Sequence, residues 1–484
     1  KMQWTKLTSY RLCWRIGQKP STLYTKSNFT PRLLPSSKHA SKFPSHFSRR
    51  HYKIPLMTFE YIEVEHRLDE HIGSCHSADT IEPAGSTDTS FGVCFLGTGG
   101  SKPTQQRMSS STVLSLGGLS YVFDAAEGVQ RQLGISRVRL QTISKIFITH
   151  MHADHVLGLP SLLMIMQVSQ RSRSDSFPIN VYGPPGLFNY ISMNMKLTES
   201  AFLGQQITVH ELVGPEACRV QPKQSRNPQN FLYAEFSHKF LQRNRIPRNK
   251  DGTWTISNPE KNTEENIRAG RASNAYSAGR TKKLFISAAE VKHLPHVPTF
   301  GYVVREQDPP LKIDVEKATA LGVKPSKKYR LLQQGFPVQS DDGTTEVLPS
   351  EVAASSSDRA RKFVLLGDNC ETPEPMRRIM QDADVMVHEA ALHHKVQSDQ
   401  ERGHSSAEMA GAVAKSTRAK VLVLNHFSNR VQDIEDVQGE VERAESTNGE
   451  TSVVVPAHDF MEIRVPREGF DTSTISASSD SKSE

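Results

Sequence analysis

The sequence predicts an α/β fold in which two mixed β-sheets pack face to face, with helices on the outside. Strand patterns follow one another closely from residue 91, whereas strand and helix patterns alternate in the C-terminal part of the chain. Several strands are short, continuous apolar runs, which is typical of strands buried on both faces. Layers of this kind bury one sheet against the other and the helices against both.

The composition is that of a globular protein. The chain has 484 residues, of which 36% are hydrophobic and 23% charged. This is enough for two or three average domains, or for one large α/β domain with insertions. No apolar run approaches the roughly 18 residues of a membrane-spanning helix. The five cysteines form no close pair, which indicates a reducing compartment and argues against a disulfide framework and against a thiolate zinc site.

The positive charge of the chain resides in its N-terminal leader. The net charge is +7, but residues 1–59 contain twelve Lys and Arg and no acidic residue, so the remainder has a net charge of −5. A leader over 1–58 that is basic, rich in Ser and Thr, and amphipathic at its start is typical of a transit peptide for the mitochondrion or another organelle. A basic arm that binds RNA is the alternative. Met57 could serve as a second start and produce a cytosolic or nuclear form.

The regular pattern spans residues 91–466, after an acidic linker over 59–90. Two of its first strands form a hairpin around the pair Gly117-Gly118. We expect strands at 91–97, 111–116, 120–124, 145–149, 179–183, 206–212, 285–292, 301–305, 362–367, 384–388, 419–425, 451–456 and 460–465, and helices at 127–134, 158–168, 184–194, 373–383, 406–417 and 431–444.

Two segments depart from this pattern. Residues 219–283 are polar, with fourteen basic against five acidic residues, and we expect them to form a disordered insertion. A solvated loop and an arm that tracks RNA phosphates are both compatible with this charge. The tail over 467–484 is acidic and rich in Ser and Thr, so we expect it to be disordered too.

The most informative stretch is His150-Met151-His152-Ala153-Asp154-His155, which follows an apolar run over 146–149. That run reads as a buried parallel strand, and open α/β sheets bind their ligands at the carboxyl ends of such strands. Imidazole and carboxylate groups suit zinc, and the pairs His150/His152 and Asp154/His155 could face two different ions. A polar loop that happens to contain histidines is the alternative reading.

Two ions need further ligands, and three other strands also end in a suitable side chain. These residues are His293 after Val291-Lys292, Asp368 after Leu366-Gly367, and His426 after Leu424-Asn425. Taken alone, each would more often be an ordinary polar cap. Their recurrence beside the histidine loop indicates a shared metal site.

With these residues the chain resembles ribonuclease Z, the transfer-RNA 3′-processing endonuclease family of the metallo-β-lactamase superfamily. The histidine loop alone marks only the superfamily, whereas the segments over 127–132, 387–390 and 404–406 are specific to the nuclease. The length and the single histidine loop resemble the short form. The resemblance covers about 91–466 outside the insertion and rests on Phe95-Leu96-Gly97-Thr98-Gly99, Phe123-Asp124-Ala125-Ala126-Glu127-Gly128, Gln130-Arg131-Gln132-Leu133, the histidine loop with Gly158-Leu159-Pro160, Phe300-Gly301-Tyr302, Gly367-Asp368, Val387-His388-Glu389-Ala390, His404-Ser405-Ser406 and Ala457-His458-Asp459-Phe460.

The resemblance implies an αβ/βα metallo-β-lactamase sandwich that holds two Zn²⁺ ions, although other divalent ions remain open. One ion would be bound by His150, His152 and His293, and the other by Asp154, His155 and His426. Asp368 would bridge the two ions. His296 competes with His293, because the family's spacing falls between the two; His293 is preferred since it ends a strand.

The same resemblance implies cleavage of precursor tRNA, with a 3′-hydroxyl left on the tRNA and a 5′-phosphate on the trailer. Asp154 would act on the attacking water, and His404, positioned by Glu389, would protonate the leaving group. Residues 308–336 would form an RNA-gripping arm, and a homodimer is implied as well. Two rival functions are another hydrolase of the superfamily and a non-catalytic RNA-binding paralogue.

Three positions depart from the family pattern. The family's Gly-Asp-Thr reads Gly-Asp-Asn here, at Asn369, and a loop linked to the RNA 3′ end has Gln105 and Met108 in place of Lys and Asn. The second departure leaves the response to CCA ends undetermined.

Overall fold

The structure is a computed structural model. It describes residues 80–81, 91–170, 178–198, 206–215, 241–257, 284–309, 311–333, 335–354, 359–392, 403–431 and 433–467. All of them belong to one compact unit, Leu68–Glu484. The leader over 1–58, nearly all of the 59–90 linker and the tail beyond 467 lie outside the described residues, so the predictions made for them stay predictions.

The first sheet is built around an antiparallel meander of β2, β3 and β4, which continues as parallel strands from β4 to β8. The β3–β4 turn takes positive φ at Gly117 and Gly118, as the predicted hairpin requires. In spatial order the described strands are β1 (Thr80–Ile81), β18 (Glu462–Arg464), β2 (Phe91–Gly97), β3 (Ser111–Leu116), β4 (Leu119–Phe123), β5 (Ile143–Phe147), β6 (Ile179–Gly183), β7 (Ile207–Val213) and β8 (Leu241–Pro247).

The second sheet is also mixed. Its strands β9 to β11 and β14 are antiparallel neighbours, whereas β14 to β17 run parallel. In spatial order the described strands are β17 (Val453–Pro456), β16 (Val421–Asn425), β15 (Val385–Glu389), β14 (Lys362–Leu365), β11 (Thr299–Glu306), β10 (Leu284–Val291) and β9 (Thr253–Ser257).

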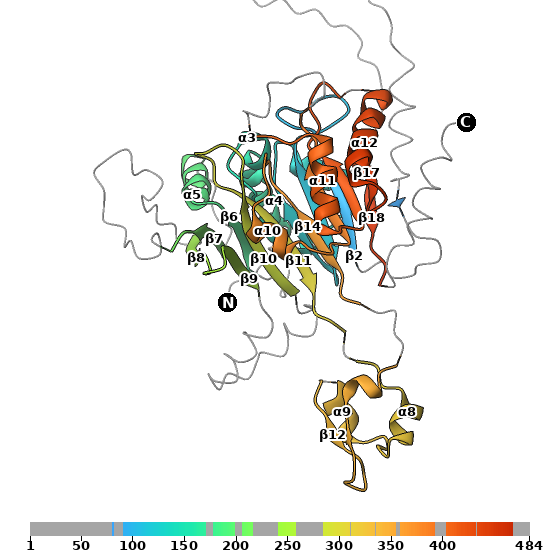
Figure 1. Cartoon of the computed structure of the whole chain (residues 1–484). Coiled ribbons are helices and arrows are strands. Elements are labelled where there is room, and N and C mark those ends of the chain that lie inside the picture. The colour runs from blue at the N-terminus through green and yellow to red at the C-terminus, as the bar shows by residue number, and fades with distance from the viewer. Residues whose placement is uncertain are drawn as a thin grey trace, which may run out of the picture. The chain divides into compact units, whose positions relative to one another are not determined.

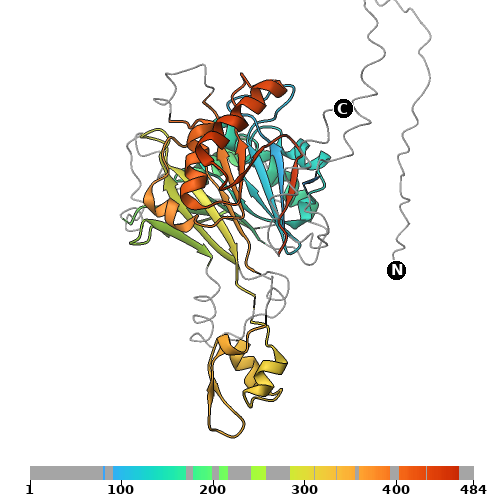
Figure 2. The same ribbon diagram turned by 45° about the vertical axis from the view of Figure 1, so that its right-hand side comes forward.

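Helices cover the outer face of each sheet (Figures 1 and 2). Aromatic side chains such as Phe123, Phe147 and Phe363 fill the space between the sheets. The predicted sandwich is therefore confirmed. No described helix is long and apolar enough to cross a membrane. The first sheet is covered by α2 (Val129–Ile135), α3 (Ala153–Val156), α4 (Leu159–Gln170) and α5 (Leu187–Leu197), and the second by α10 (Glu374–Ile379), α11 (Ala407–Thr417) and α12 (Ile434–Asn448); single 3₁₀ turns lie at Leu140–Thr142 and Pro349–Glu351.

The prediction of disorder across 219–283 is wrong for residues 241–257. These residues form β8 and β9, which extend the two sheets and lie side by side at one edge (Figure 1). Their polar sequence is explained by the edge position of both strands, since edge strands carry charged side chains. Arg243 on β8 pairs with the buried carboxylate of Glu211 on β7 at 2.6 Å, so part of the positive charge is structural.

Trp254 on β9 anchors this edge in the core. Its side chain is 3% exposed, stands edge-on to the Phe300 ring at 5.1 Å between centroids, and donates from Nε1 to the Val213 carbonyl at 3.0 Å. We expect Trp254→Ala to lower the free energy of unfolding by about 3–5 kcal/mol in urea titrations. The neighbouring Thr255→Ala should cost only about 1 kcal/mol. Equal losses for the two variants would contradict the role assigned to Trp254.

The predicted arm over 308–336 is part of a larger folded element. Described residues between 311 and 354 form two helices, α8 (Val315–Ala320) and α9 (Lys327–Gln333), and a hairpin of β12 (Val338–Gln339) and β13 (Glu346–Val347). The element has its own small apolar core of Ala318, Val323, Leu332, Val338, Val347 and Val352. The folded element extends beyond residue 336, the predicted end of the arm, because residues 337–354 complete that core.

Candidate metal centre

The histidine loop lies at the carboxyl end of β5, as predicted, and β5 runs parallel to both of its neighbours. Asp124, at the end of β4, fixes the start of the loop. Its carboxylate accepts hydrogen bonds from the Thr149 backbone N–H at 2.7 Å and from the Thr149 hydroxyl at 2.9 Å. The short helix α3, which the sequence did not predict, then places Asp154 and His155 in its only turn.

One cluster of potential ligand atoms consists of His150, His152, His293 and Asp368. His152 Nδ1 lies 3.0 Å from His150 Nε2 and 3.3 Å from His293 Nε2. The Gly403 carbonyl, 2.7 Å from His293 Nδ1, fixes that ring so that Nε2 faces the cluster. The structure brings His293 into the site, whereas the side chain of the competing His296 is exposed and belongs to none of the described clusters.

A second cluster consists of Asp154, His155 and His426. The Nε2 atoms of the two imidazoles lie 3.1 Å apart, and Asp154 Oδ2 is 3.4 Å from His426 Nε2. Asp124 accepts from the opposite nitrogen of His155, Nδ1, at 2.8 Å. A carboxylate behind a histidine in this way fixes the tautomer and the ring direction that a metal ligand needs.

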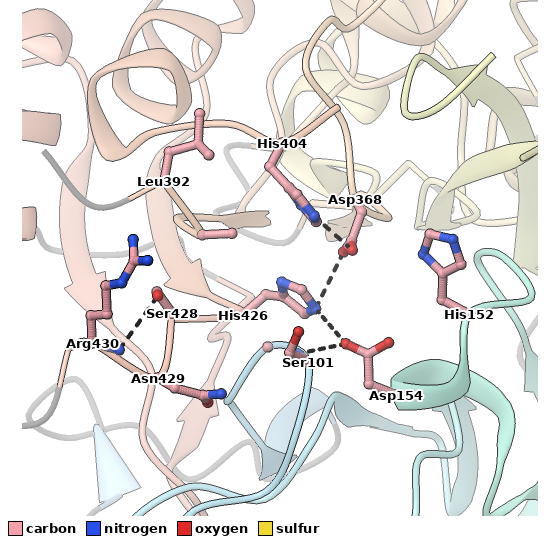
Figure 3. A pocket seen from close by; sticks show the side chains of 12 residues that line it. Ser101, His152, Asp154, Asp368, Leu392, His404, His426, Ser428, Asn429 and Arg430 are labelled. Carbon is pink, nitrogen blue, oxygen red and sulfur yellow. Dashed lines mark hydrogen bonds and ion pairs between the residues drawn. The ribbon is translucent and has the colours of Figure 1, made fainter. Parts of the chain in front are cut away.

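Asp368 connects the two clusters, and Figure 3 shows its contact with His426. Its Oδ2 lies 3.7 Å from His150 Nε2, and its Oδ1 lies 3.5 Å from both His155 Nε2 and His426 Nε2. The residue follows β14, which ends at Leu365, two residues before the predicted end. All seven predicted ligands therefore converge, although they come from four separate strand ends.

The electrostatics favour the neutral imidazole at His150, His152 and His293. The Asp368 carboxylate instead raises the pKa of His155 and His426 against the effect of burial. Burial, followed by the charge of His155, lowers the pKa of His150 well below its usual range, and burial also lowers the pKa of His152 and His293. Burial alone would raise the pKa of Asp368, but the neighbouring imidazoles His426 and His155 outweigh it and lower this pKa well below the usual range. Neutral imidazole and ionised carboxylate are the forms that bind metal ions.

His404 and Glu389 lie together at the edge of the metal site. His404 Nδ1 is 2.9 Å from Glu389 Oε2 and 3.7 Å from Asp368 Oδ2. Burial by itself would lower the pKa of His404, but the charge and the hydrogen bond of Glu389 outweigh it and raise this pKa to about 9. His404 is thus held as a protonated donor beside the metal site.

The site opens into a cleft of about 450 Å³. Figure 3 shows His152, Asp154, Asp368, His404 and His426 among the side chains that line it. Its remaining wall is formed by Gly100, Ser101, Ala391, Leu392, Ser428, Asn429 and Arg430. The cleft gives an anionic substrate access to the cluster.

The donor set fits a metal ion that accepts nitrogen and oxygen ligands, such as zinc. The cluster consists of imidazoles and carboxylates, and neither described cysteine, Cys94 or Cys370, belongs to it. Most of its members are buried, and buried ionisable groups at such short separations require a compensating charge.

Comparison with known proteins identifies the family. The chain is 33% identical to human zinc phosphodiesterase ELAC protein 1 over 387 residues, which is 78% of this chain and 99% of that protein. The chain belongs to the ribonuclease Z family. It is 29% identical to ribonuclease Z of Rippkaea orientalis, over 78% of this chain and 98% of that protein. The crystal structure of human tRNase Z, short form, aligns over 78% of this chain and 99% of that one, with 26% identity and a TM-score of 0.48. A family model described as anti-Pycsar protein Apyc1 matches residues 91–189.

As a member of the ribonuclease Z family with a metallo-β-lactamase fold, the protein is a metal-dependent phosphodiester hydrolase. The structure shows the contacts of the residues at and beside the departures from the family pattern. The side chain of Asn369 donates to the Gly367 carbonyl at 2.9 Å, and its backbone N–H donates to Glu389 Oε1 at 2.5 Å. In the loop at 103–108, Gln105 is exposed to solvent, while Arg107 stacks over Phe427 at 4.5 Å.

Sequence reasoning missed the residues that support the ligands. It assigned no role to Asp124, which holds His155, or to Gly403, whose carbonyl holds His293. It also missed Ser101, whose backbone N–H donates to Asp154 Oδ2 at 2.6 Å. A carboxylate at the end of the strand next to β5 was a usable signal for Asp124, because ligand histidines usually have such a partner. Backbone donors and acceptors give no such signal.

Proposed function

We propose that this protein is a zinc-dependent endoribonuclease that removes the 3′ trailer from precursor tRNA, leaving a 3′-hydroxyl on the tRNA and a 5′-phosphate on the trailer. The observation that carries the proposal is the position of Asp368 between two ligand clusters, with the His404–Glu389 pair beside it. The names of the relatives, ribonuclease Z and tRNase Z, support the substrate class.

In this proposal, His150, His152 and His293 would hold one zinc ion and Asp154, His155 and His426 the other, and Asp368 would serve both. Zinc in such a site would make water a nucleophile at neutral pH and offset the negative charge of the scissile phosphate. The chain's own groups supply the remaining tasks, which are positioning and proton transfer.

Asp154 lies in the cleft and is fixed by the Ser101 N–H and by His426. Its carboxylate would orient the attacking water and accept its proton. His404 would protonate the ribose 3′-oxygen as the phosphodiester bond breaks, which yields the 3′-hydroxyl. Glu389 would hold the imidazole of His404 in the orientation needed for that transfer. Its carboxylate is hydrogen-bonded to Nδ1 of the ring, which leaves the other nitrogen, Nε2, to donate the proton.

Folded RNA would be bound chiefly through its phosphates, by basic side chains on the 311–354 element. Lys324, Lys327 and Arg330 are exposed there. We expect the triple variant Lys324→Ala/Lys327→Ala/Arg330→Ala to raise KM for precursor tRNA without lowering kcat, and to reduce the slope of log affinity against log salt by roughly 0.7–0.9 per lost contact. Removing three charges elsewhere, from Arg137, Lys196 and Lys415, is the control; an equal rise in KM would contradict the assignment.

Cleavage of a 3′-end-extended precursor tRNA tests the proposed function. The wild-type protein should cut once at the trailer junction, the trailer should be a substrate for 5′-phosphate-dependent exonuclease, and a chelator should abolish the reaction until zinc is returned. Hydrolysis of a small phosphodiester without any cut in the tRNA would instead favour another hydrolase of the superfamily. Absence of both activities in the metal-loaded protein would favour a binding protein.

We propose further that the protein forms a homodimer. Met164 and Val168, exposed by 44% and 60%, are four residues apart and share a face of α4, and Leu157, exposed by 53%, lies in the turn before that helix. Sedimentation analysis should give twice the monomer mass, and Met164→Glu/Val168→Glu should give the monomer mass. A monomeric wild-type protein would refute the proposal.

We also propose that the leader over 1–58 directs the chain to the mitochondrion, because it is basic and free of acidic residues. A fluorescent fusion to residues 1–58 should accumulate in mitochondria, and a diffuse signal would argue against this role.

A further inference from the structure

Two segments that are distant in sequence are joined by hydrogen bonds beside the second ligand cluster. One follows β2 and contains Gly100, and the other follows β16 and contains His426. The Phe427 N–H donates to the Thr98 carbonyl at 3.0 Å, and the Gly100 N–H donates to the Phe427 carbonyl at 2.9 Å. Gly100 has no room for a side chain, since a Cβ atom would lie 2.8 Å from Cε1 of His426. The backbone of the first segment therefore packs directly against a metal ligand.

Residues 100–102 form a γ-turn. The Lys102 N–H donates to the Gly100 carbonyl at 3.0 Å, and Ser101 at the centre has a φ of 67°. A positive φ is uncommon for serine, and γ-turns of this hand are rare and strained. The conformation directs the Ser101 N–H at Asp154, where it donates to Oδ2 at 2.6 Å. Figure 3 shows this contact beside the contact between Asp154 and His426.

Asn429 holds the turn in place from the opposite segment. With its amide nitrogen facing the turn, the side chain donates to the Gly100 carbonyl at 3.2 Å and to the Lys102 carbonyl at 3.1 Å. These are the carbonyls at the two ends of the turn. Asn429, three residues after the ligand His426, thus closes the turn with a single side chain. The central N–H of that turn contacts Asp154.

We propose that Asn429 and the γ-turn over 100–102 are a positioning element for one of the two metal ions, the one bound by Asp154, His155 and His426. Asn429 fixes the turn, the turn aims the Ser101 N–H at one oxygen of Asp154, and the carboxylate is thereby held in the direction of the ion. The same packing, through Gly100, limits the rotation of the His426 ring. His150, His152 and His293 are held by one another and by the Gly403 carbonyl, so the ion of that cluster should be unaffected.

This inference rests on the proposed two-ion centre, and its test is the affinity of each zinc ion for the full-length protein. Zinc content is measured by mass spectrometry during titration with a chelator. Two variants are compared with wild type: Asn429→Ala, and Asn429→Asp, which keeps the shape of the side chain but loses the N–H donor. In both, one ion should be released at a chelator concentration about 10–100-fold lower than in wild type. The other ion should be released as in wild type.

Ser101→Gly is the matched variant, because it keeps the backbone N–H and adopts positive φ without strain; it should retain both ions with wild-type affinity. Asn244→Ala, on the edge strand β8, is a control for loss of an asparagine elsewhere. Thermal unfolding of the metal-free proteins shows whether a variant is damaged generally. Wild-type release of both ions from Asn429→Ala, or equal weakening of both ions, would overturn the inference. A wild-type protein that binds only one ion would instead refute the two-ion proposal.

Discussion

Asp368→Ala should reduce the bound zinc from two ions per chain to one or none and lower cleavage of precursor tRNA to the uncatalysed background. Asp368 is the only described residue whose two carboxylate oxygens face both ligand clusters, at 3.5 and 3.7 Å from their imidazole nitrogens. Its removal also leaves several buried imidazoles without their counter-charge. Zinc content by mass spectrometry and single-turnover cleavage rates measure the two effects.

The control for this variant is Asp382→Ala, which removes an exposed carboxylate that pairs with Arg418 at the surface. It should bind two ions and cleave at the wild-type rate, because surface ion pairs contribute little. An Asp368→Ala protein that still binds two ions and keeps a tenth of the activity would contradict the bridging role.

His404→Gln should lower kcat by about 10²–10⁴-fold, as expected for a lost general acid, with little change in KM. The effect should be chemical rather than structural, because His404 is 24% exposed at the cleft and is not among the seven expected ligands. Zinc content should therefore stay at the wild-type value. A substrate whose bridging 3′-oxygen is replaced by sulfur needs little protonation, so the variant should recover most of its rate on that substrate.

Glu389→Gln extends this prediction, because Glu389 acts only through His404 in the proposed mechanism. The double variant His404→Gln/Glu389→Gln should be no slower than His404→Gln alone, since the effects of mutating residues that act as a unit do not add. Fully additive losses would show that Glu389 contributes by another route, such as its contact with the Asn369 N–H. Loss of zinc from either single variant would contradict the separation of acid and ligand roles.

The sandwich could be predicted from the sequence because many of its strands are continuous apolar runs. The runs at 363–366 and 421–424 became β14 and β16, with their polar end residues at the site. The residues that converge in the two clusters could be selected for the same reason, since a strand end fixes where the next side chain lies. Spacing could not decide which of His293 and His296 enters the cluster. This depends on how residues 292–298 fold and on the Gly403 carbonyl, which is hydrogen-bonded to the His293 ring.

The features that were missed leave little or no local pattern in the sequence. Strands β8 and β9 were missed because edge strands need only a few apolar residues, and in β9 that role falls to Trp254. Helix α3 was missed because it is a single turn of four residues and its Asp154 and His155 read as loop ligands. The γ-turn at Ser101 is set by contacts with a segment more than 300 residues away, and a local pattern carries no information about such contacts.

Anomalous scattering at the zinc edge from crystals of the zinc-loaded protein tests the central claim most directly. Two peaks of comparable height are expected, one beside His150, His152 and His293 and the other beside Asp154, His155 and His426, with the Asp368 carboxylate between them. A single peak at full occupancy, or two peaks with Asp368 turned away from both, would contradict it.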